Sequence, residues 1–255
     1  LEPEGEKKKG PEYETIAGFG PNLGITDPEF VFAANEICDR YGIDTISASN
    51  TISLAFRLFE LGIIDEEDTG GWALRWGDQQ AAEEMLRLLV AQEGIGEALS
   101  QGALALGRHF GVEELAIQVN GLEIAYHDPR ALSGMALVYA TSPRGACHNQ
   151  SDYYFVDVGG VEEDLGMKFF DRHADSEKAG NVVIHQNWRT VFNALIVCIF
   201  GPVAPNELVG LINAACGLNW DINELLKAGD RAWNLKRVIN NRLGCLLYTS
   251  PSPRD

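Results

Sequence analysis

The fold class is decided by the stretch Thr26-Asp-Pro-Glu-Phe-Val-Phe-Ala-Ala-Asn-Glu-Ile-Cys-Asp-Arg-Tyr-Gly42, which carries the signals of an α-helix in order. Asp27 offers a side-chain oxygen to the first turn, and Pro28 suits the first helical position. Apolar residues then recur at helical spacing. We predict a helix that starts after Asp27 and stops near Gly42.

Helical patterns recur along most of the chain. Asn50 starts a second pattern, which ends at Gly62, and Asp78 starts a third. Further helices are predicted at residues 96–107, 129–140, 206–215 and 222–242. Strand signals are sparse, and the two segments rich in β-forming residues are short enough to be edge strands or extended connectors, at residues 115–119 and 181–184. The fold class is therefore mainly α, a multihelical chain with few short strands.

The length of 255 residues, with 45% hydrophobic residues, is enough for two ordinary domains with real cores. Two polar, glycine-containing segments, 65–78 and 157–178, are predicted to be loops. We expect a domain boundary near residues 111–121, which gives domains at 1–115 and 116–244. The last residues, 245–255, change abruptly to a Ser- and Pro-rich composition, and we expect them to be a non-native tail.

Composition and charge exclude several classes of function. A formal net charge of -17 and a pI near 4.6 would repel nucleic acid. No apolar run approaches the roughly 20 residues that a membrane helix needs. Five cysteines without a close-spaced pair argue against a disulfide scaffold and against a self-contained zinc site. We therefore expect a cytoplasmic protein with no nucleic-acid or membrane partner.

Several polar groups are candidates for chemistry, and each has an ordinary structural alternative. The pair Glu12 and Glu14 is of a kind that is usually a solvated surface feature. Adjacent Cys147 and His148 point to opposite faces of an extended chain and rarely act as a dyad. Cys198 lies in an apolar run, where a cysteine is usually a small buried hydrophobe. These residues alone leave the function open.

Two glycine arrangements depart from the dinucleotide-binding fingerprint. The segment Gly18-Phe-Gly-Pro-Asn-Leu-Gly24 has one residue too many and Pro21 in its middle, and the segment at 94–96 lacks the third glycine. Neither follows a credible strand, so nucleotide binding is not predicted.

Four motifs occur in the order typical of one enzyme family: Gly10-Pro-Glu-Tyr-Glu-Thr15, Asn35-Glu-Ile-Cys-Asp-Arg-Tyr-Gly-Ile-Asp-Thr-Ile-Ser47, Pro143-Arg-Gly-Ala-Cys-His148 and Gly229-Asp-Arg-Ala-Trp-Asn-Leu-Lys-Arg237. Over almost all of residues 10–244 the chain resembles the aldehyde ferredoxin oxidoreductase family. The resemblance implies two helical domains packed around a tungsten, or occasionally molybdenum, centre held by two pyranopterin dithiolenes, with a 4Fe-4S cluster nearby. It also implies oxidation of a small aldehyde to a carboxylic acid, with ferredoxin as the electron acceptor.

The segment Asp39-Arg-Tyr-Gly-Ile-Asp44 is similar to the first Asp-x-x-Gly-Leu-(Asp or Cys) pterin-binding motif of that family. The resemblance implies that Asp39, Gly42, Ile43 and Asp44 bind the cofactor. Carboxylates accept hydrogen bonds from the donor-rich edge of a pterin, so the sign of the charge suits the task.

The second such motif aligns with Asn193-Ala-Leu-Ile-Val-Cys198, which implies cofactor contacts by Asn193 and Val197. Asn193 replaces the Asp of the motif and Ile196 replaces its Gly, so the charge assistance of the hydrogen bond is lost. Cys198 is similar to the fourth ligand of the iron–sulfur cluster, which usually needs four thiolates. The other three are expected in a Cys-x-x-Cys-x-x-x-Cys run before residue 10. We therefore expect a fragment that is inactive alone.

The resemblance also implies catalytic roles. Glu14 is similar to the active-site glutamate of the family and is expected to act as a base on the attacking water. His148 is similar to the histidine beside the metal and is expected to donate a hydrogen bond to the aldehyde oxygen. His127 stands where some relatives carry Tyr and is expected to shape the substrate pocket.

Two other functions stay open at this stage. Tungsten subunits of benzoyl-CoA reductases share the fold and the cofactor but run a reductive reaction. The missing cluster ligands and the altered second motif also suit a helical interaction module without a cofactor. The sequence leaves open the identity of the aldehyde and the formation of a homo-oligomer.

Overall fold

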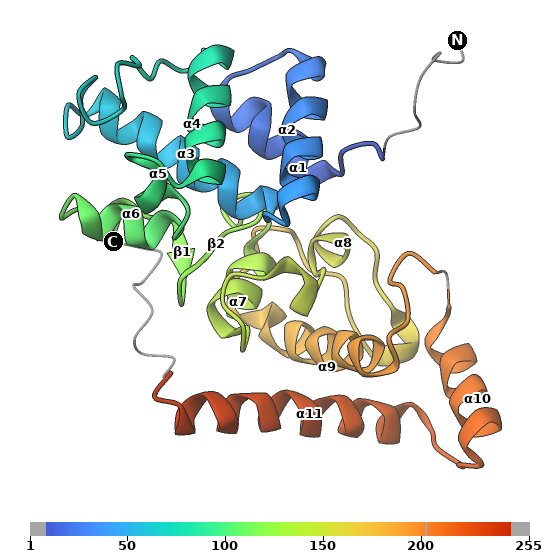
Figure 1. Cartoon of the computed structure of the whole chain (residues 1–255). Coiled ribbons are helices and arrows are strands. Elements are labelled where there is room, and N and C mark those ends of the chain that lie inside the picture. Colours follow the sequence, from blue (N-terminus) through green and yellow to red (C-terminus); the bar gives the residue numbers. More distant parts are fainter. Residues whose placement is uncertain (1–8, 202, 246–255) are drawn as a thin grey trace, which may run out of the picture. The chain divides into compact units, whose positions relative to one another are not determined.

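The computed structural model describes residues 9–201 and 203–245, so the expected tail lies outside the described residues from position 246 onward. The chain divides into two compact units, Leu1–Tyr126 and His127–Asp255. Both units are built from helices (Figure 1), and the described residues contain two short strands. The prediction of a mainly α fold with few strands is confirmed.

The first unit contains six helices and one small hairpin among its described residues. Its elements are α1 (Tyr13–Phe19), η1 (Pro21–Leu23), α2 (Pro28–Tyr41), α3 (Thr45–Glu60), α4 (Gln79–Ala91), α5 (Gly96–Leu99), α6 (Ala103–His109), η2 (Glu113–Leu115), β1 (Gln118–Val119) and β2 (Leu122–Glu123). The two strands are antiparallel, and Val119 pairs with Leu122.

Helix α3 is the centre of the first unit. Ile52, Ala55, Phe56 and Leu58 on this helix are fully buried, and α1, α4, α5 and α6 all contact it. Full burial of a Leu, Ile or Phe side chain contributes about 1.5–3 kcal/mol. The core of this unit therefore depends on the apolar face of α3.

Two helices of the first unit form where their capping signals predict them. Asp27 accepts a hydrogen bond from the Glu29 backbone N–H at 3.0 Å, and Gly42 ends α2 in the left-handed region with φ of 68°. Asp78 caps α4 in the same manner, through the Ala81 N–H. Local capping chemistry is sufficient to place both helices.

Other boundaries in this unit differ from the predictions. Helix α3 starts at Thr45 rather than at Asn50, because the Asp44 carboxylate caps it by accepting from the Ser47 N–H at 2.8 Å. The helix predicted at 96–107 is two helices, α5 and α6, separated at Gly102 with φ of 91°. Only Gln118–Val119 of the segment 115–119 is a strand. The predictions missed α1.

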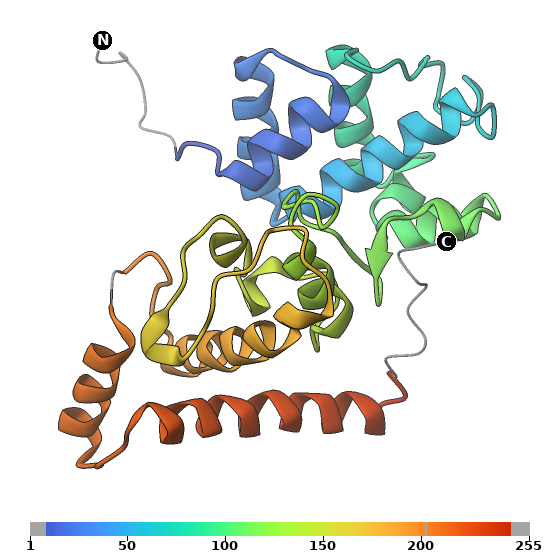
Figure 2. The same ribbon diagram turned by 180° about the vertical axis from the view of Figure 1, so that it is seen from behind.

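The second unit contains five helices among its described residues. Its elements are α7 (Ser133–Thr141), η3 (His148–Gln150), α8 (Tyr154–Asp157), η4 (Glu163–Leu165), η5 (Ser176–Lys178), α9 (Ala179–Leu195), α10 (Pro205–Cys216) and α11 (Ile222–Arg242). Helices α9 and α11 run side by side in both views (Figures 1 and 2). A Cβ at Gly229 of α11 would lie 2.1 Å from the Asn187 carbonyl oxygen of α9. Glycine therefore permits the close approach of these two helices.

Two predictions for the second unit need correction. The β-rich segment 181–184 lies inside α9, where Val182, His185, Trp188 and Phe192 form a buried helical face, so packing overrides strand propensity. The helix predicted at 129–140 starts at Ser133, because the residues before it form a turn around Asp128. The helices predicted at 206–215 and 222–242 are confirmed as α10 and α11.

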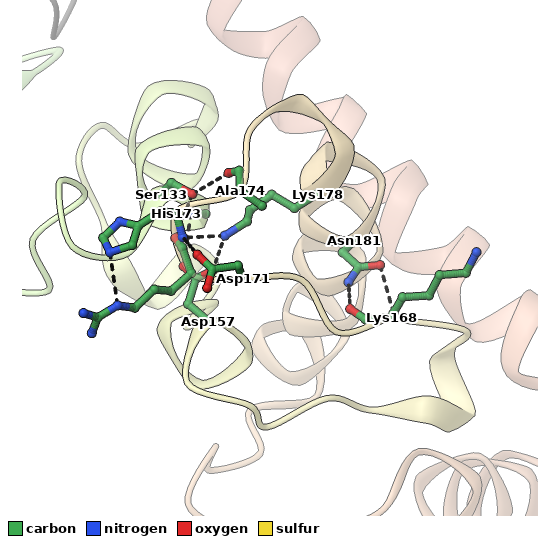
Figure 3. Close-up of polar contacts among 10 residues, drawn as sticks. Ser133, Asp157, Lys168, Asp171, His173, Ala174, Lys178 and Asn181 are labelled. Atoms are coloured by element: carbon green, nitrogen blue, oxygen red, sulfur yellow. Dashed lines mark hydrogen bonds and ion pairs between the residues drawn. The ribbon is translucent and has the colours of Figure 1, made fainter.

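A buried ion pair fastens the long loop between α8 and α9 (Figure 3). Lys178 Nζ lies 2.6 Å from the Asp157 carboxylate, and both side chains are 1% exposed. Asp157 also accepts from the Gly134 N–H at 3.1 Å, and Lys178 donates to the Arg172 carbonyl oxygen at 3.1 Å. Ser133 at the start of α7 donates to carbonyl groups of the same loop. The predicted loop at 157–178 is confirmed, and these contacts order it.

Candidate active site

Glu14 lies in the first turn of α1, in the first unit. Its side chain is buried, with 9% of the residue exposed, although the sequence pattern suggested a solvated pair with Glu12. The Tyr126 backbone N–H donates to Glu14 Oε2 at 2.7 Å. The neighbouring Tyr13 hydroxyl donates to the Tyr126 carbonyl oxygen at 3.3 Å. A buried carboxylate held by a main-chain donor has a fixed direction, as a general base requires.

The first proposed pterin motif lies at the turn between α2 and α3. Gly42, Ile43 and Asp44 line a cavity of about 350 Å³, together with Ser47, Thr51, Leu99, Ser100 and other residues of α3, α4 and α5. Asp39 is exposed one turn earlier and is not among the lining residues. The structure thus brings three of the four predicted residues of this motif to one cavity.

The residues around this cavity suit a pterin edge. The cavity is of the size that small cofactor sites have, roughly 300 Å³ and more. Its lining includes Asp44, Ser47 and Ser100, whose carboxylate and hydroxyl groups are of the kind that hydrogen-bond an amide-rich heterocycle. Burial raises the pKa of the Cys38 thiol, in the last turn of α2, to about 12.

In the second unit, the rings of His127, His148 and Tyr154 form a stack. The centroids of His127 and Tyr154 are 3.7 Å apart with an interplanar angle of 21°, and those of His127 and His148 are 5.7 Å apart. The Tyr139 hydroxyl donates to the His127 carbonyl oxygen at 3.0 Å. The two histidines predicted to serve catalysis are therefore neighbours, and Tyr154 fixes the plane of the His127 ring.

The second unit also contains a buried polar network, between α9 and the residues before α8. The Arg189 guanidinium is 2.5 Å from the Asp152 carboxylate, and His185 Nδ1 is 2.7 Å from the Ser151 hydroxyl. Burial lowers the pKa of His185 to about 4, so its imidazole is neutral. Burial likewise lowers the pKa of Arg189, and the Asp152 carboxylate opposes this shift.

The second proposed pterin motif has the same backbone form as the first. Helix α9 ends at Leu195, Ile196 takes the left-handed conformation with φ of 57°, and the Val197 N–H bonds to the Phe192 carbonyl oxygen at 3.2 Å. In the first motif Gly42 has φ of 68°, and the Ile43 N–H bonds to the Cys38 carbonyl oxygen. The helix-end geometry is thus preserved although Ile replaces Gly. Asn193 and Cys198 are both exposed.

The described residues do not by themselves provide a metal site. Across residues 9–201 and 203–245, no group of three or more His, Cys, Asp or Glu side chains is arranged to hold a metal ion. Cys198 is exposed and is a single thiolate donor, whereas a 4Fe-4S cluster usually needs four. An iron–sulfur cluster therefore does not fit the described residues alone. Within the same residues, no helix is both long and apolar enough to cross a membrane.

Sequence comparison places these features in a family. The sequence model described as "Aldehyde ferredoxin oxidoreductase, domains 2 & 3" matches residues 1–249. The chain belongs to this family. It is 33% identical over 241 residues to the tungsten-containing aldehyde ferredoxin oxidoreductase of Pyrococcus furiosus, and 34% identical over 243 residues to that of Pyrococcus horikoshii. Each alignment covers 92% of this chain and 39% of the relative, so the chain spans well under half of these enzymes.

One further relative and one solved structure extend the comparison. An aliphatic sulfonate oxidoreductase, WOR-like subunit, of Pyrococcus furiosus is 33% identical over 155 residues, which is 58% of this chain and 25% of that protein. The solved active site complex BamBC of benzoyl coenzyme A reductase in complex with 1,5 dienoyl-CoA has a similar fold, with a TM-score of 0.73 at 18% identity. The alignment covers 94% of this chain and 42% of that one. The family is thus an oxidoreductase family whose members named here include tungsten-containing enzymes.

Sequence reasoning missed three residues of these neighbourhoods: Tyr126, Tyr154 and Arg189. Tyr126 is 112 positions from Glu14, and no local pattern marks such a contact. Tyr154 closely follows the motif that ends at His148, and its aromatic side chain near the histidines was the sequence signal that could have predicted the ring stack.

Proposed function

We propose that this chain contributes to the oxidation of an aldehyde to a carboxylic acid at a bis-pyranopterin tungsten centre, with ferredoxin as electron acceptor. The observation that carries the proposal is the buried Glu14 carboxylate, fixed by a main-chain donor in a family of tungsten-containing oxidoreductases. Molybdenum is the alternative metal for the same donors. The reaction adds one water oxygen to the aldehyde carbon and releases two protons and two electrons.

The side chains of this chain supply acid–base and electrostatic functions in the proposal. Glu14 takes a proton from the attacking water, which then bonds to the carbonyl carbon. The imidazole of His148 donates a hydrogen bond to the carbonyl oxygen, where negative charge develops. His127, held by Tyr154, forms a wall of the substrate pocket. Removal of one such donor or base typically costs about 10²–10⁴ in rate.

Two helix-end turns would hold the pterins of the cofactor. Gly42, Ile43 and Asp44 would bind one pterin at the cavity beside α3. Asp39, exposed one turn earlier on α2, would bind the same pterin. Asn193 and Val197 would contact the second pterin through the turn that follows α9. When bound, this cofactor accepts the electron pair of the aldehyde C–H bond. Cys198 would supply one thiolate to an iron–sulfur cluster, and the described residues provide no complete set.

A chimera tests the proposal. Residues 10–244 of this chain would replace the matching segment of the Pyrococcus furiosus enzyme, and aldehyde-dependent reduction of a viologen dye would be measured without oxygen. We expect Glu14→Gln to lower kcat by about 100-fold or more. The exposed Glu12→Gln is the matched control, two residues away, and should retain the rate.

The outcomes separate the competing functions. Full activity of Glu14→Gln would contradict the role of Glu14 as the base. Reduction of an aromatic thioester without oxidation of any aldehyde would favour the benzoyl-CoA reductase type of reaction. A folded chimera that binds no metal would favour a helical interaction module.

A further inference from the structure

Residues 123–126, the last of the first unit, are fastened to its helices at nearly every position. The Glu123 carboxylate accepts from the Ala103 N–H at 2.6 Å, and Asn50 of α3 donates to the Ile124 carbonyl oxygen at 3.0 Å. Ala125 is buried. The segment therefore reaches Tyr126 in a fixed register against α1 and α3.

The side chain of Tyr126 is anchored as firmly as its backbone. Its hydroxyl lies 2.7 Å from the Ser49 hydroxyl and accepts from Asn22 Nδ2 at 3.2 Å. Burial raises the pKa of this phenol above its ordinary value, so the hydroxyl keeps its proton and can donate. Three elements, α1, η1 and α3, thus contribute contacts to one residue.

Gly18 makes room for this arrangement. A Cβ at Gly18 would lie 2.2 Å from the Ser49 hydroxyl oxygen and 2.7 Å from Cε2 of the Tyr126 ring. No real side chain tolerates such distances, so only glycine permits the ring and the hydroxyl at this place on α1. Gly18 lies one helical turn after Glu14, in the glycine segment that does not fit a dinucleotide site.

The backbone of Tyr126 also forms hydrogen bonds with the first two residues of α1, Tyr13 and Glu14. Its N–H donates to Glu14 Oε2 at 2.7 Å, and its carbonyl oxygen accepts from the Tyr13 hydroxyl. A hydrogen bond to a charged group contributes about 1.5–3 kcal/mol, twice that of a neutral pair. Any displacement of the Tyr126 backbone therefore moves the carboxylate with it.

We propose that Tyr126 is the positioning residue of the Glu14 carboxylate, acting through its backbone N–H and anchored by its buried hydroxyl between α1 and α3. This inference rests on the proposed function, in which Glu14 is the base. Tyr126 acts through Glu14. Gly18 leaves the space that the Tyr126 ring occupies, and Ser49 hydrogen-bonds to the Tyr126 hydroxyl. A misplacement of about 1 Å at such a base lowers turnover by up to about 100-fold without weakening substrate binding.

The contact itself is tested in the 255-residue chain by hydrogen exchange of the Tyr126 amide, resolved in ¹H–¹⁵N spectra. We expect Glu14→Ala to raise its exchange rate about 10-fold or more, since a charge-assisted bond is lost. Gly18→Ala should raise it as well. Gly210→Ala is the matched control, because a Cβ at Gly210 meets nothing within 4 Å. An exchange rate that Glu14→Ala leaves unchanged would overturn the proposal.

The positioning role is tested by kinetics in the chimera. Tyr126→Phe keeps the ring and removes the anchoring hydroxyl, and we expect a several-fold lower kcat with KM unchanged, and a larger loss for Gly18→Ala. Tyr153→Phe is the control, because Tyr153 is a buried tyrosine of the second unit and should leave kcat unchanged. Equal kcat for wild type and for both Tyr126→Phe and Gly18→Ala, with Glu14→Gln inactive, would overturn the positioning role. A responsive amide with full activity in Glu14→Gln would instead overturn the proposed function, and the positioning role with it.

Discussion

Ile196 is a β-branched residue in a conformation that glycine prefers. It has φ of 57° and ψ of 38° at the end of α9, and 93% of the residue is exposed. For an L-residue the left-handed conformation costs about 1–2 kcal/mol, and a β-branched side chain is a genuine outlier there. Because the side chain is exposed, its removal loses almost no apolar burial. Ile196→Gly should therefore release most of this strain.

The net gain is smaller than the strain, because glycine has more freedom in the unfolded chain. That term is about 0.5–1 kcal/mol, which leaves a stabilisation of about 1 kcal/mol. For a chain of this size, 1 kcal/mol raises Tm by about 2–4 °C. The increase would be measured by urea unfolding and by calorimetry, with an unchanged m-value.

The matched control is the preceding residue. Leu195 is the last residue of α9 and is 41% exposed, so Leu195→Gly introduces the same residue into a right-handed helical conformation. It should destabilise the protein by about 1 kcal/mol. If Ile196→Gly destabilised the protein as much as Leu195→Gly does, residue 196 would not be left-handed in solution. The equivalence of the two helix-end motifs would then be wrong.

Three further predictions follow from buried contacts of the second unit. Lys178→Met should lower the free energy of unfolding, measured in urea, by about 3–5 kcal/mol, because it leaves the Asp157 carboxylate buried and uncompensated. Adding Asp157→Leu should recover part of that loss. Equal stability of Lys178→Met and wild type would refute the buried ion pair. Gly229→Ala should lower the free energy of unfolding by more than about 2 kcal/mol because α9 lies against it, whereas Gly210→Ala should not. An unchanged free energy of unfolding in Gly229→Ala would show that α9 and α11 lie further apart. Burial lowers the pKa of His185 to about 4, so its neutral form stabilises the fold above about pH 6.5, and roughly 3 kcal/mol of that stability is lost as the pH falls from there towards 4. His185→Asn should therefore flatten the pH dependence of the free energy of unfolding. An unchanged slope would refute the burial of a neutral His185.

Local sequence signals were sufficient where capping and periodicity agree. Helices α2 and α4 lie where Asp27 and Asp78 predict them, because each carboxylate caps its own chain two or three residues ahead. The same chemistry explains the error at α3. Asp44 is the cap, but it also belongs to the proposed pterin motif, and the apolar pattern that begins at Asn50 conceals the first turn.

Tertiary packing decided the remaining elements. Residues 181–184 are rich in β-branched side chains, yet they lie in α9 because the buried face of that helix extends to Phe192. Neither the strand propensity of these residues nor the pattern within a short stretch of sequence shows which face of the helix is buried. Helix α1 is short and begins in a Pro-containing segment, so its periodicity is too brief to detect.

The site residues likewise divide into those marked by a local motif and those placed by tertiary contacts. The helix-end motif at 39–44 is contiguous, and the structure places Gly42, Ile43 and Asp44 at one cavity. Glu14 depends on Tyr126, a residue 112 positions away, and the ring stack of His127 depends on Tyr154. A single sequence shows motif residues but not the residues that hold them in place.

Tungsten content tests the central claim most directly, with variants that separate cofactor binding from helix capping. Asp44→Asn in the chimera removes the charge at the cavity but keeps an oxygen that caps α3. Asp78→Asn makes the same change at the cap of α4, outside that cavity. After anaerobic expression with tungstate, we predict near-stoichiometric tungsten in the parent chimera and in Asp78→Asn, and a several-fold loss in Asp44→Asn. A folded parent chimera without tungsten, or equal tungsten in all three proteins, would contradict the assignment of this cavity to the cofactor.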